Sequence, residues 1–383
     1  MNPGDIPLSV YIHWPWCLAK CPYCDFNSHR APAQATRAAS REAYVQALLE
    51  DLSSQQALVQ GRIAHSVFLG GGTPSLFTPD EVGWVLQALM NSVAFEPHTE
   101  VTMEVNPGAL EHGSLAEYRA VGVNRVSIGA QSFDAATLKR LGRLHSPRET
   151  RNAVQQARAA GFTRINLDLM HGLPGQDLGA ALIDVDAALA LDVDHISYYQ
   201  LTLEPNTRFH AFPPQLPEES VLEDIAVSGA ARLTAAGFEQ YEVSAWARPA
   251  QACRHNLNYW LFGDYLALGA GAHGKLSFPD GTYRYARAAH PRGYMDVASR
   301  PPELQALDDS AISFEFMLNA LRLNDGFSSD VFEQRTGRAF ELIRPRIESA
   351  VGKGLMVSDE TGRWSTTPLG KRFLNDLQAH FLS

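Results

Sequence analysis

Short β-rich runs alternate with longer helical patterns through the first half of this 383-residue chain. The strand-like runs lie at residues 8–13, 66–69, 100–105, 124–128, 164–168 and 195–199. Helical patterns fill the gaps, near residues 41–59, 79–91, 114–121, 134–142, 148–160 and 178–191. Strands that alternate with helices favour a parallel sheet, because each helix carries the chain back to the start of the next strand. We therefore expect an α/β fold whose six strands curl into a partial (β/α)6 barrel.

Polar and glycine-rich segments follow these predicted strands. Three cysteines come after the first strand, Gly70-Gly-Gly-Thr-Pro74 comes after the second, and Glu104 lies at the end of the third. Gln131, Asp168 and Thr202 occupy similar places on the last three strands. In a β/α barrel the carboxyl ends of the strands lie at one face, where the active site forms. We therefore expect these side chains to surround a single barrel mouth.

The cysteines of the first loop have the spacing CxxxCxxC, at Cys17, Cys21 and Cys24, and are three of only four in the chain. Soft thiolates select iron–sulfur clusters, zinc or cuprous copper. A structural zinc site needs a fourth ligand, which His13 or His29 could supply. Three thiolates on a four-iron cluster instead leave one iron open for chemistry. Disulfides are disfavoured because the chain is long, poor in cysteine and begins without a signal segment.

The other segments at the strand ends also have purely structural explanations. Gly70–Gly72 could form only a tight turn, and Glu104 and Asp168 could be paired structural carboxylates. Carboxylates in apolar runs are costly without partners, however, and ribose hydroxyls or an amino group would satisfy them. Arg143 could be a solvated helix residue or could bind a ligand carboxylate.

The composition limits the class of protein. A chain of this length with 45% hydrophobic residues can bury a large core, and we expect two domains. The formal charge of -10 argues against nucleic acid as a partner. No run is long and apolar enough for an integral membrane segment, and no targeting segment is visible. We expect a reduced, cytoplasmic protein.

The second half of the chain predicts an extension and a smaller domain. A helical pattern at 218–236 precedes a strand-like run at 240–243, and the stretch from Arg284 to Pro302 has the composition of a connector. Beyond it lie helical patterns at 308–322, 328–335 and 339–352 and short strand-like runs at 355–357 and 363–365. We expect residues 1–300 to form the barrel, with an extension at about 240–300, and residues 301–383 to form a winged-helix-like α+β domain.

DNA binding is the activity that a winged helix first suggests, but the charge of this segment argues against it. Residues 306–383 contain 9 Lys and Arg against 11 Asp and Glu. The positive charge that dominates DNA affinity is therefore missing. Protein docking or capping of the barrel mouth is the role that we expect instead.

Several motifs resemble a known family. CxxxCxxC with Tyr23 before its last cysteine, followed by GGGTP, resembles the signature of the radical S-adenosylmethionine (SAM) superfamily. Four further segments resemble the branch of that superfamily that contains the oxygen-independent coproporphyrinogen III dehydrogenases and the HemW-type heme chaperones. These segments are Glu104–Pro107, Arg125–Phe133, Leu141–His145 and Ile165–Gly175.

The resemblance implies two cofactors at the barrel mouth. Cys17, Cys21 and Cys24 would hold a 4Fe-4S cluster, and SAM would bind the fourth iron through its amino and carboxylate groups. By position in the motifs, the residues implied to contact SAM are Tyr11, Tyr23, Gly71, Gly72, Thr73, Glu104, Gln131, Arg143, Asp168, Thr202 and His273. The dehydrogenases carry a further cysteine where this chain has Phe26, and a longer segment ahead of the first strand.

A motif near residue 255 resembles the heme-binding HNxxYW motif of the chaperones. It lies in Cys253-Arg-His-Asn-Leu-Asn-Tyr-Trp260, where His255 is the implied axial ligand and Tyr259 and Trp260 could pack against the macrocycle. Cys253 is a second candidate ligand. A histidine beside aromatic residues is otherwise an ordinary core residue, and a solitary cysteine is ordinarily a small hydrophobic residue.

The resemblance favours a heme chaperone that transfers heme to an acceptor protein, for which a respiratory, membrane-associated protein is one candidate. The main alternative is an oxygen-independent coproporphyrinogen III dehydrogenase, which decarboxylates propionates by hydrogen abstraction. A third hypothesis is another radical SAM reaction, with HNxxYW serving only for packing. The motifs identify no catalytic residue.

Overall fold

The computed structural model describes residues 3–33, 37–108 and 113–382. Within them, a single twelve-stranded sheet has the order β14-β13-β12-β11-β1-β4-β5-β6-β7-β8-β10-β9. Its centre is the run of parallel strands β1 (Leu8–Trp14), β4 (Ile63–Gly71), β5 (Ala94–Val105), β6 (Arg125–Gln131), β7 (Arg164–His171) and β8 (His195–Gln200). These strands confirm the predicted α/β class and partial barrel.

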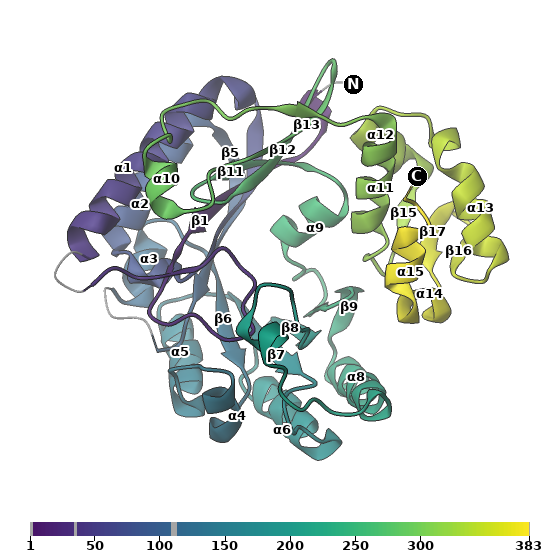
Figure 1. Ribbon diagram of the computed structural model, residues 1–383, viewed down its shortest axis with the longest axis horizontal. Coiled ribbons are helices and arrows are strands. Elements are labelled where there is room, and N and C mark those ends of the chain that lie inside the picture. The colour runs from purple at the N-terminus through teal and green to yellow at the C-terminus, as the bar shows by residue number, and fades with distance from the viewer. Residues whose placement is uncertain (1–2, 34–36, 109–112, 383) are drawn as a thin grey trace.

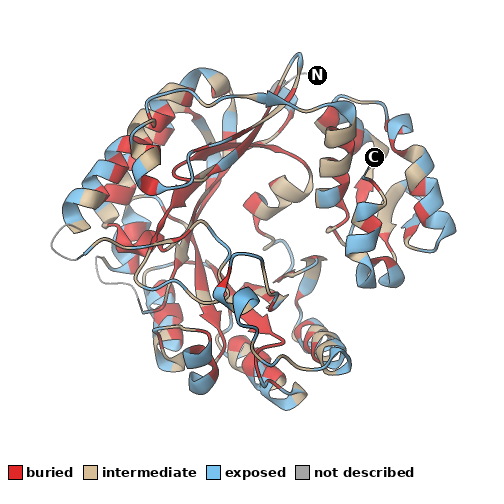
Figure 2. Ribbon diagram, viewed as in Figure 1, coloured by how far each residue is buried: buried red, intermediate tan, exposed pale blue. Residues whose placement is uncertain are grey.

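Helices cover the outer face of the parallel strands (Figure 1). They are α1 (Arg37–Gln55), α2 (Pro79–Ser92), α3 (Leu115–Ala120), α4 (Ala135–Arg140), α5 (Pro147–Ala159), α6 (Leu178–Leu189) and α8 (Glu219–Ala235). The short helix α7 (Arg208–Ala211) instead lies beside the cysteine loop, where the Phe209 N–H donates to the Pro22 carbonyl. Three of the helices, α2, α3 and α5, begin with a capping box. In each, the side chain of Thr78, Ser114 or Ser146 accepts a hydrogen bond from the backbone N–H three residues later. Figure 2 shows that the buried residues concentrate on the strands and on the helix faces toward them.

The sheet continues beyond the six parallel strands at both ends, in agreement with the expected β-extension and with the strand-like run at 240–243. Strands β9 (Glu239–Glu242) and β10 (Ala245–Ala247) extend one end, and β11 (Asp264–Leu268), β12 (His273–Phe278), β13 (Gly281–Ala286) and β14 (Gln305–Ala306) extend the other. The interpretation of Arg284–Pro302 as a connector is therefore wrong in part, because β13 runs to Ala286 and a short helix, α10 (Pro291–Met295), follows. Tyr285 is buried in β13, which favours a strand despite the loop-like composition.

The C-terminal elements form a smaller unit with an apolar core of their own. Helices α11 (Asp309–Ala320), α12 (Ser329–Thr336), α13 (Arg344–Gly352), α14 (Pro368–Arg372) and α15 (Leu374–Ala379) surround an antiparallel sheet of β15 (Phe327–Ser328), β17 (Arg363–Thr366) and β16 (Met356–Ser358). Phe316, Phe332 and Ile347 are among its buried residues. This arrangement agrees with the winged-helix-like expectation, while the proposed domain boundary at residue 300 stays a prediction.

The C-terminal unit contacts both ends of the open sheet. On one side, Glu315 of α11 forms an ion pair with Arg284 of β13. On the other, Asn324 donates its backbone N–H to the Tyr241 carbonyl of β9 at 3.1 Å. Figure 1 shows a short helix, α9 (Arg254–Trp260), between the sheet and α11. The gap between the two sheet ends is thus occupied by α9 and covered by α11.

Candidate functional site

The three cysteines of the first loop line a cavity of about 420 Å³ at the carboxyl ends of the parallel strands. The loop is held by a short parallel pairing of β2 (Trp16–Cys17) with β3 (His29–Arg30). The same cavity is lined by most of the residues that the sequence implies for SAM, namely Tyr23, Gly71, Gly72, Thr73, Glu104, Gln131, Arg143, Asp168 and Thr202. Residues from six strands and their loops therefore meet around one mouth.

Polar side chains lie beside all three cysteine sulfurs. The pairs are Thr73 with Cys17 at 3.5 Å, Ser28 with Cys24 at 3.5 Å and Arg143 with Cys21 at 3.8 Å. Hydrogen bonds of this kind stabilise sulfur ligands and tune an iron–sulfur cluster. Burial raises the pKa of the Cys17 and Cys24 thiols, so binding of iron by these thiolates would release protons.

The turn after β4 requires glycine at two positions. Gly71 has a φ of +107°, and a Cβ atom there would lie 2.3 Å from the His13 ring. A Cβ atom on Gly72 would lie 2.7 Å from the carbonyl oxygens of Trp14 and Trp16. The glycines therefore allow the turn to pack against β1, and both line the cavity without a side chain that would keep a ligand away from the backbone.

Two half-buried carboxylates face the cavity. Glu104, near the end of β5, accepts a hydrogen bond from the Gly71 N–H at 2.9 Å. Burial, followed by the negative charge of Asp168, raises the pKa of Glu104 to about 8. Asp168 accepts from Asn166 Nδ2 at 2.7 Å and Ser127 Oγ at 3.1 Å, and burial raises its pKa as well. A cationic ligand would favour the ionised form of both carboxylates, which fits the amino and sulfonium groups of SAM.

Arg143 and Gln131 complete the polar wall of the cavity. Arg143 Nη2 donates to the Gly129 carbonyl at 2.8 Å and to Asn106 Oδ1 at 3.4 Å. Gln131 has a φ of +64°, a left-handed conformation that a non-glycine residue keeps only where its surroundings hold it. Its side-chain oxygen accepts from the Tyr199 hydroxyl at 2.7 Å. A guanidinium held in this way can bind a ligand carboxylate.

The zinc alternative lacks support from the geometry. The two ring nitrogens of His13 lie 3.0 Å from the Tyr11 hydroxyl and 3.0 Å from the Asn27 carbonyl, so both have partners. His29 Nε2 lies 3.1 Å from Asn27 Oδ1. Among the residues described, no three His, Cys, Asp or Glu side chains converge closely enough to hold a single metal ion. A four-iron cluster is larger than one ion and suits three cysteines spread around a cavity.

Two residues implied for SAM are not among those that line the cavity. Tyr11 lies on β1 and contacts His13, and His273 is the exposed first residue of β12. Their roles stay predictions. Conversely, Ser127 and Tyr199 line the cavity although the sequence analysis did not select them. Each lies two residues from another residue that faces the cavity, and side chains two residues apart point to the same face of a strand. This alternation could have identified both residues from the sequence.

The HNxxYW motif forms α9, at a distance from the cysteine loop. His255 is buried, its ring stacks on Phe68 at 5.0 Å, and Tyr259 lies edge-on at 5.0 Å. His255 Nδ1 lies 3.2 Å from Ser66 Oγ, whereas its Nε2 is buried and has no hydrogen-bond partner among the residues that the structure describes. Burial lowers the pKa of His255 to about 3, so the imidazole is neutral. A neutral imidazole with an unpartnered nitrogen has the chemistry of an axial heme ligand.

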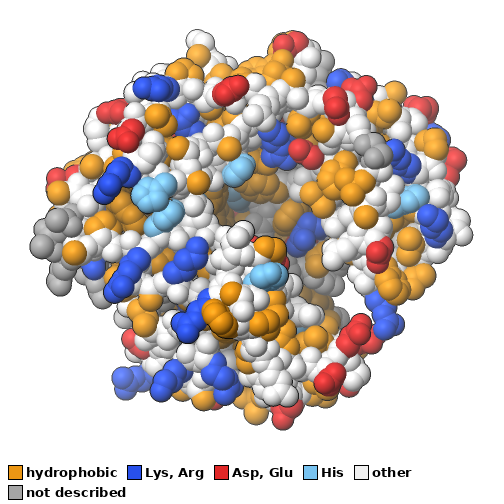
Figure 3. Space-filling model, in the orientation of Figure 1, with side chains coloured by type: hydrophobic (Ala, Val, Ile, Leu, Met, Phe, Trp, Pro, Cys, Tyr) orange, Lys and Arg blue, Asp and Glu red, His pale blue; other side chains and the backbone are white. Residues whose placement is uncertain are grey.

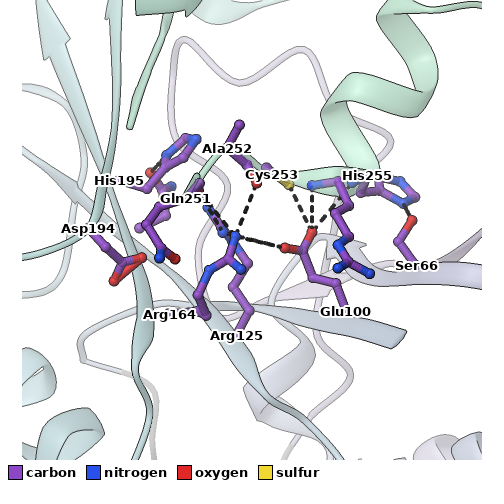
Figure 4. Close-up of polar contacts among 12 residues, drawn as sticks. Ser66, Glu100, Arg125, Arg164, Asp194, His195, Gln251, Ala252, Cys253 and His255 are labelled. Carbon is purple, nitrogen blue, oxygen red and sulfur yellow. Dashed lines mark hydrogen bonds and ion pairs between the residues drawn. The ribbon is translucent and has the colours of Figure 1, made fainter. Parts of the chain in front are cut away.

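Glu100 of β5 holds the start of this helix (Figure 4). Its Oε1 accepts from the Arg254 N–H at 2.9 Å and from the Cys253 thiol at 3.4 Å. Its Oε2 pairs with Arg164 at 3.2 Å and Arg125 at 3.5 Å. Burial, and then the charge of Glu100, raise the pKa of Cys253 to about 12. Cys253 is therefore a buried neutral thiol, which counts against it as a thiolate ligand of heme.

The two candidate sites lie at different points along the same strand, β5. Glu100 contacts the start of α9, and Glu104 lies four residues further along β5, at the cavity. Side chains four residues apart point to the same face of a strand and are separated by about 13 Å. The cysteine cavity and the HNxxYW helix are therefore distinct sites that share the barrel interior.

Comparisons with known proteins agree with this architecture. Residues 11–182 match the family model of the radical SAM superfamily, and residues 307–373 match that of the HemN C-terminal domain. Among solved structures, coproporphyrinogen III oxidase (HemN) of Escherichia coli superimposes with a TM-score of 0.82 over 100% of this chain and 92% of its own. It is 23% identical in sequence, so the match establishes the shared fold alone.

Curated relatives align with nearly the whole chain. The heme chaperone HemW of Escherichia coli K12 is 45% identical over 380 residues, which cover 98% of each chain. The heme chaperone HemW of Haemophilus influenzae is 43% identical over 384 residues, again 98% of each chain. The heme chaperone HemW of Mycobacterium tuberculosis H37Rv is 37% identical over 92% of this chain and 89% of its own. The chain therefore belongs to the HemW family within the radical SAM superfamily.

Proposed function

We propose that this protein binds heme and transfers it to an acceptor protein, using a radical SAM scaffold that also holds a 4Fe-4S cluster and SAM. The observation that carries this proposal is the 45% identity to a heme chaperone over 98% of both chains. The unpartnered Nε2 of His255 within HNxxYW supports it from the structure.

In this proposal Cys17, Cys21 and Cys24 ligate the cluster, with Thr73, Ser28 and Arg143 donating hydrogen bonds to their sulfurs. Glu104 and Asp168 bind the cationic part of SAM, and Arg143 is placed to bind its carboxylate. When bound and reduced, the cluster supplies an electron for cleavage of SAM. The protein residues orient SAM and exclude water from the cavity.

His255 is the proposed axial ligand of heme iron, with Tyr259 and Trp260 packing against the macrocycle. Ser66 Oγ, itself 2.7 Å from Ser9 Oγ, can accept a hydrogen bond from the Nδ1–H of His255, and this tautomer leaves the lone pair on Nε2 for iron. We do not assign Cys253 as a ligand, because its thiol is neutral and donates to a carboxylate.

Oxidative decarboxylation of coproporphyrinogen III is the rival function, because the cysteine and glycine motifs at the cavity also resemble those of the dehydrogenases. Against it, Phe26 stands at the cavity edge where the dehydrogenases have a further cysteine, and its side chain is exposed. Heme handling therefore remains the better-supported function.

The test begins with anaerobic reconstitution by iron and sulfide, followed by titration with heme. We expect stoichiometric heme binding that His255→Ala weakens strongly. His65→Ala is the matched control, since His65 contacts α9 through Asn258 at 3.3 Å but lies outside the motif. Heme binding unchanged by His255→Ala would remove this molecular basis, and conversion of coproporphyrinogen III to protoporphyrinogen IX would defeat the chaperone proposal.

The acceptor and the location are also parts of the proposal. No helix in the described part of the chain is long and apolar enough to cross a membrane. We propose that the protein works in the cytoplasm and delivers heme to a separate acceptor, with a membrane-associated respiratory protein as one candidate. Incubation of the heme-loaded protein with apo-acceptors, followed by separation and heme quantification, would identify which protein receives it.

A further inference from the structure

The proposed heme ligand cannot reach heme in the conformation described. His255 Nε2 is buried, with Phe68 stacked on one side of the ring and Tyr259 edge-on at the other. The side of α9 away from the barrel strands is covered by α11, where Phe316 packs against Phe262 at 5.8 Å. Heme therefore needs a part of this packing to open before iron can bind Nε2. The question is which contacts exchange when it does.

One candidate contact is the ion pair between Arg284 of β13 and Glu315 of α11. Arg284 Nε and Nη2 lie 2.8 and 2.5 Å from Glu315 Oε2. Arg284 also donates to the hydroxyl of Tyr265, whose ring lies 4.3 Å from that of Tyr259 in the motif. The guanidinium is thus one side chain away from the proposed heme site, and the ion pair fastens α11 to the barrel on that side.

A second ion pair has the same arrangement on the other side of α9. Arg322, just after α11, places its guanidinium 4.4 Å from the centre of the Trp260 ring. Its Nη2 and Nε lie 2.9 and 3.2 Å from Glu242 Oε2 on β9. Two arginines therefore flank the motif helix, and each is bound to a carboxylate across the boundary between the barrel and the C-terminal unit.

Both carboxylates can lose the ion pair with arginine and still have other polar groups or water as hydrogen-bond donors. Glu315 is partly exposed, so water can solvate it. Glu242 is buried but keeps two donors through its other oxygen, Ser244 Oγ at 2.9 Å and the Ser244 N–H at 3.2 Å. The usual penalty for leaving a buried charge unpaired is therefore reduced.

We propose that Arg284 and Arg322 bind the two propionates of heme, and that in the heme-free protein these arginines pair instead with Glu315 and Glu242. This proposal rests on the proposed function. A propionate is a carboxylate, so it can form the same hydrogen bonds with a guanidinium that the glutamates form. When a propionate replaces Glu315 on Arg284, α11 is no longer held to β13 at this point, and the macrocycle can approach α9. Figure 3 shows that the surface is hollowed between the barrel and the C-terminal unit, with basic side chains near the hollow.

The test compares variants that break the same ion pair from opposite sides. Titration of the reconstituted protein with iron protoporphyrin IX, followed by Soret absorbance, gives the affinity. We expect Arg284→Gln and Arg322→Gln each to weaken binding about tenfold, the value for loss of a hydrogen bond between charged groups. Glu315→Gln should strengthen binding about threefold, because it releases Arg284 from a partly exposed ion pair.

The opposite signs distinguish this role from a structural one. Arg284→Gln and Glu315→Gln both remove the ion pair between α11 and β13, so the loss of stability from that contact is shared, and only Arg284→Gln also removes the hydrogen bond to Tyr265. A change of heme affinity in the same direction for both would overturn the proposal. Iron protoporphyrin IX dimethyl ester is a second probe, and its binding should not respond to Arg284→Gln; an equal response to the free acid and the ester would also overturn it.

Failure of this inference can be told apart from failure of the proposed function. Heme binding that depends on His255 but not on either arginine refutes only the propionate assignment. Heme binding that does not depend on His255, or no binding by the reconstituted wild-type protein, refutes the proposed function and this inference with it.

Discussion

Replacement of Glu100 is the most informative test of how the barrel holds the HNxxYW helix. The carboxylate accepts from the N–H of Arg254 and the thiol of Cys253, and it pairs with Arg125 and Arg164. Arg125 and Arg164 lie on the neighbouring strands β6 and β7, so the Glu100 side chain joins three strands to the start of α9 (Figure 4). Arg164 also donates to the carbonyls of Gln251 and Ala252, just ahead of this helix. Glu100→Ala should therefore disturb both the stability of the barrel and the position of α9.

The expected loss of stability follows from how deeply the two arginines that pair with Glu100 are buried. The Arg125 side chain is 1% exposed, so removal of Glu100 leaves an almost fully buried guanidinium without its carboxylate. Breaking a buried ion pair from one side costs about 3–5 kcal/mol. Arg164 is 25% exposed and adds little, because water can solvate it. We expect Glu100→Ala to lower the free energy of unfolding by about 3–5 kcal/mol and Glu100→Gln by about 2–3 kcal/mol, since Gln keeps an acceptor.

The assay is urea unfolding followed by circular dichroism, together with heme titration on the folded protein. Glu96→Gln is the matched control, because Glu96 lies on the same strand and approaches Arg254 at 4.0 Å, but both side chains are 47% exposed. An exposed pair of this kind contributes less than about 1 kcal/mol. Heme affinity should fall with Glu100→Ala and stay constant with Glu96→Gln. A loss of stability below about 1 kcal/mol for Glu100→Ala would refute the account of this network.

Three further predictions concern the cavity. Gly71→Ala should destabilise the protein by about 1–3 kcal/mol more than Gly175→Ala, since both have positive φ but only Gly71 lies against a histidine ring; equal losses in urea unfolding would contradict this. The folded chain keeps the proton on Glu104 up to about pH 8, against an ordinary pKa of 4.5, so the free energy of unfolding should fall as pH rises from about 5 to 8. Glu104→Gln should flatten that slope, and an unchanged slope would show that another group causes it. Cys21→Ala should abolish the visible cluster absorbance and SAM binding, whereas Cys253→Ala should preserve both; a normal cluster in Cys21→Ala would overturn the ligand assignment.

The central part of the fold could be predicted because its signals are local. Most of the six parallel strands are short and largely apolar, and the residues that follow them surround one mouth because parallel strands of a barrel end at the same face. The cysteine spacing and the glycine turn are likewise contiguous in sequence. Gly71 illustrates this, since its conformation and its contact with the first strand both require glycine.

The remaining elements depend on contacts that no local pattern contains. Lys275 is fully buried in β12, where Asp264 at 2.8 Å balances its charge, so a buried strand carries a residue typical of the surface. The environment of Cys253 is determined by Glu100, which lies 153 residues earlier. Likewise, Arg284 and Glu315 come close to each other and to the motif helix only in the folded chain, so no local sequence pattern indicates their ion pair.

The measurement that tests the central claim most directly is the electron paramagnetic resonance spectrum of ferric heme bound to the wild-type protein and to His255→Ala. The account predicts a histidine-ligated heme signal in the wild type that is lost in His255→Ala, with the iron–sulfur cluster content equal in both. A heme signal that is the same in both proteins would show that His255 is not the ligand and would contradict the account.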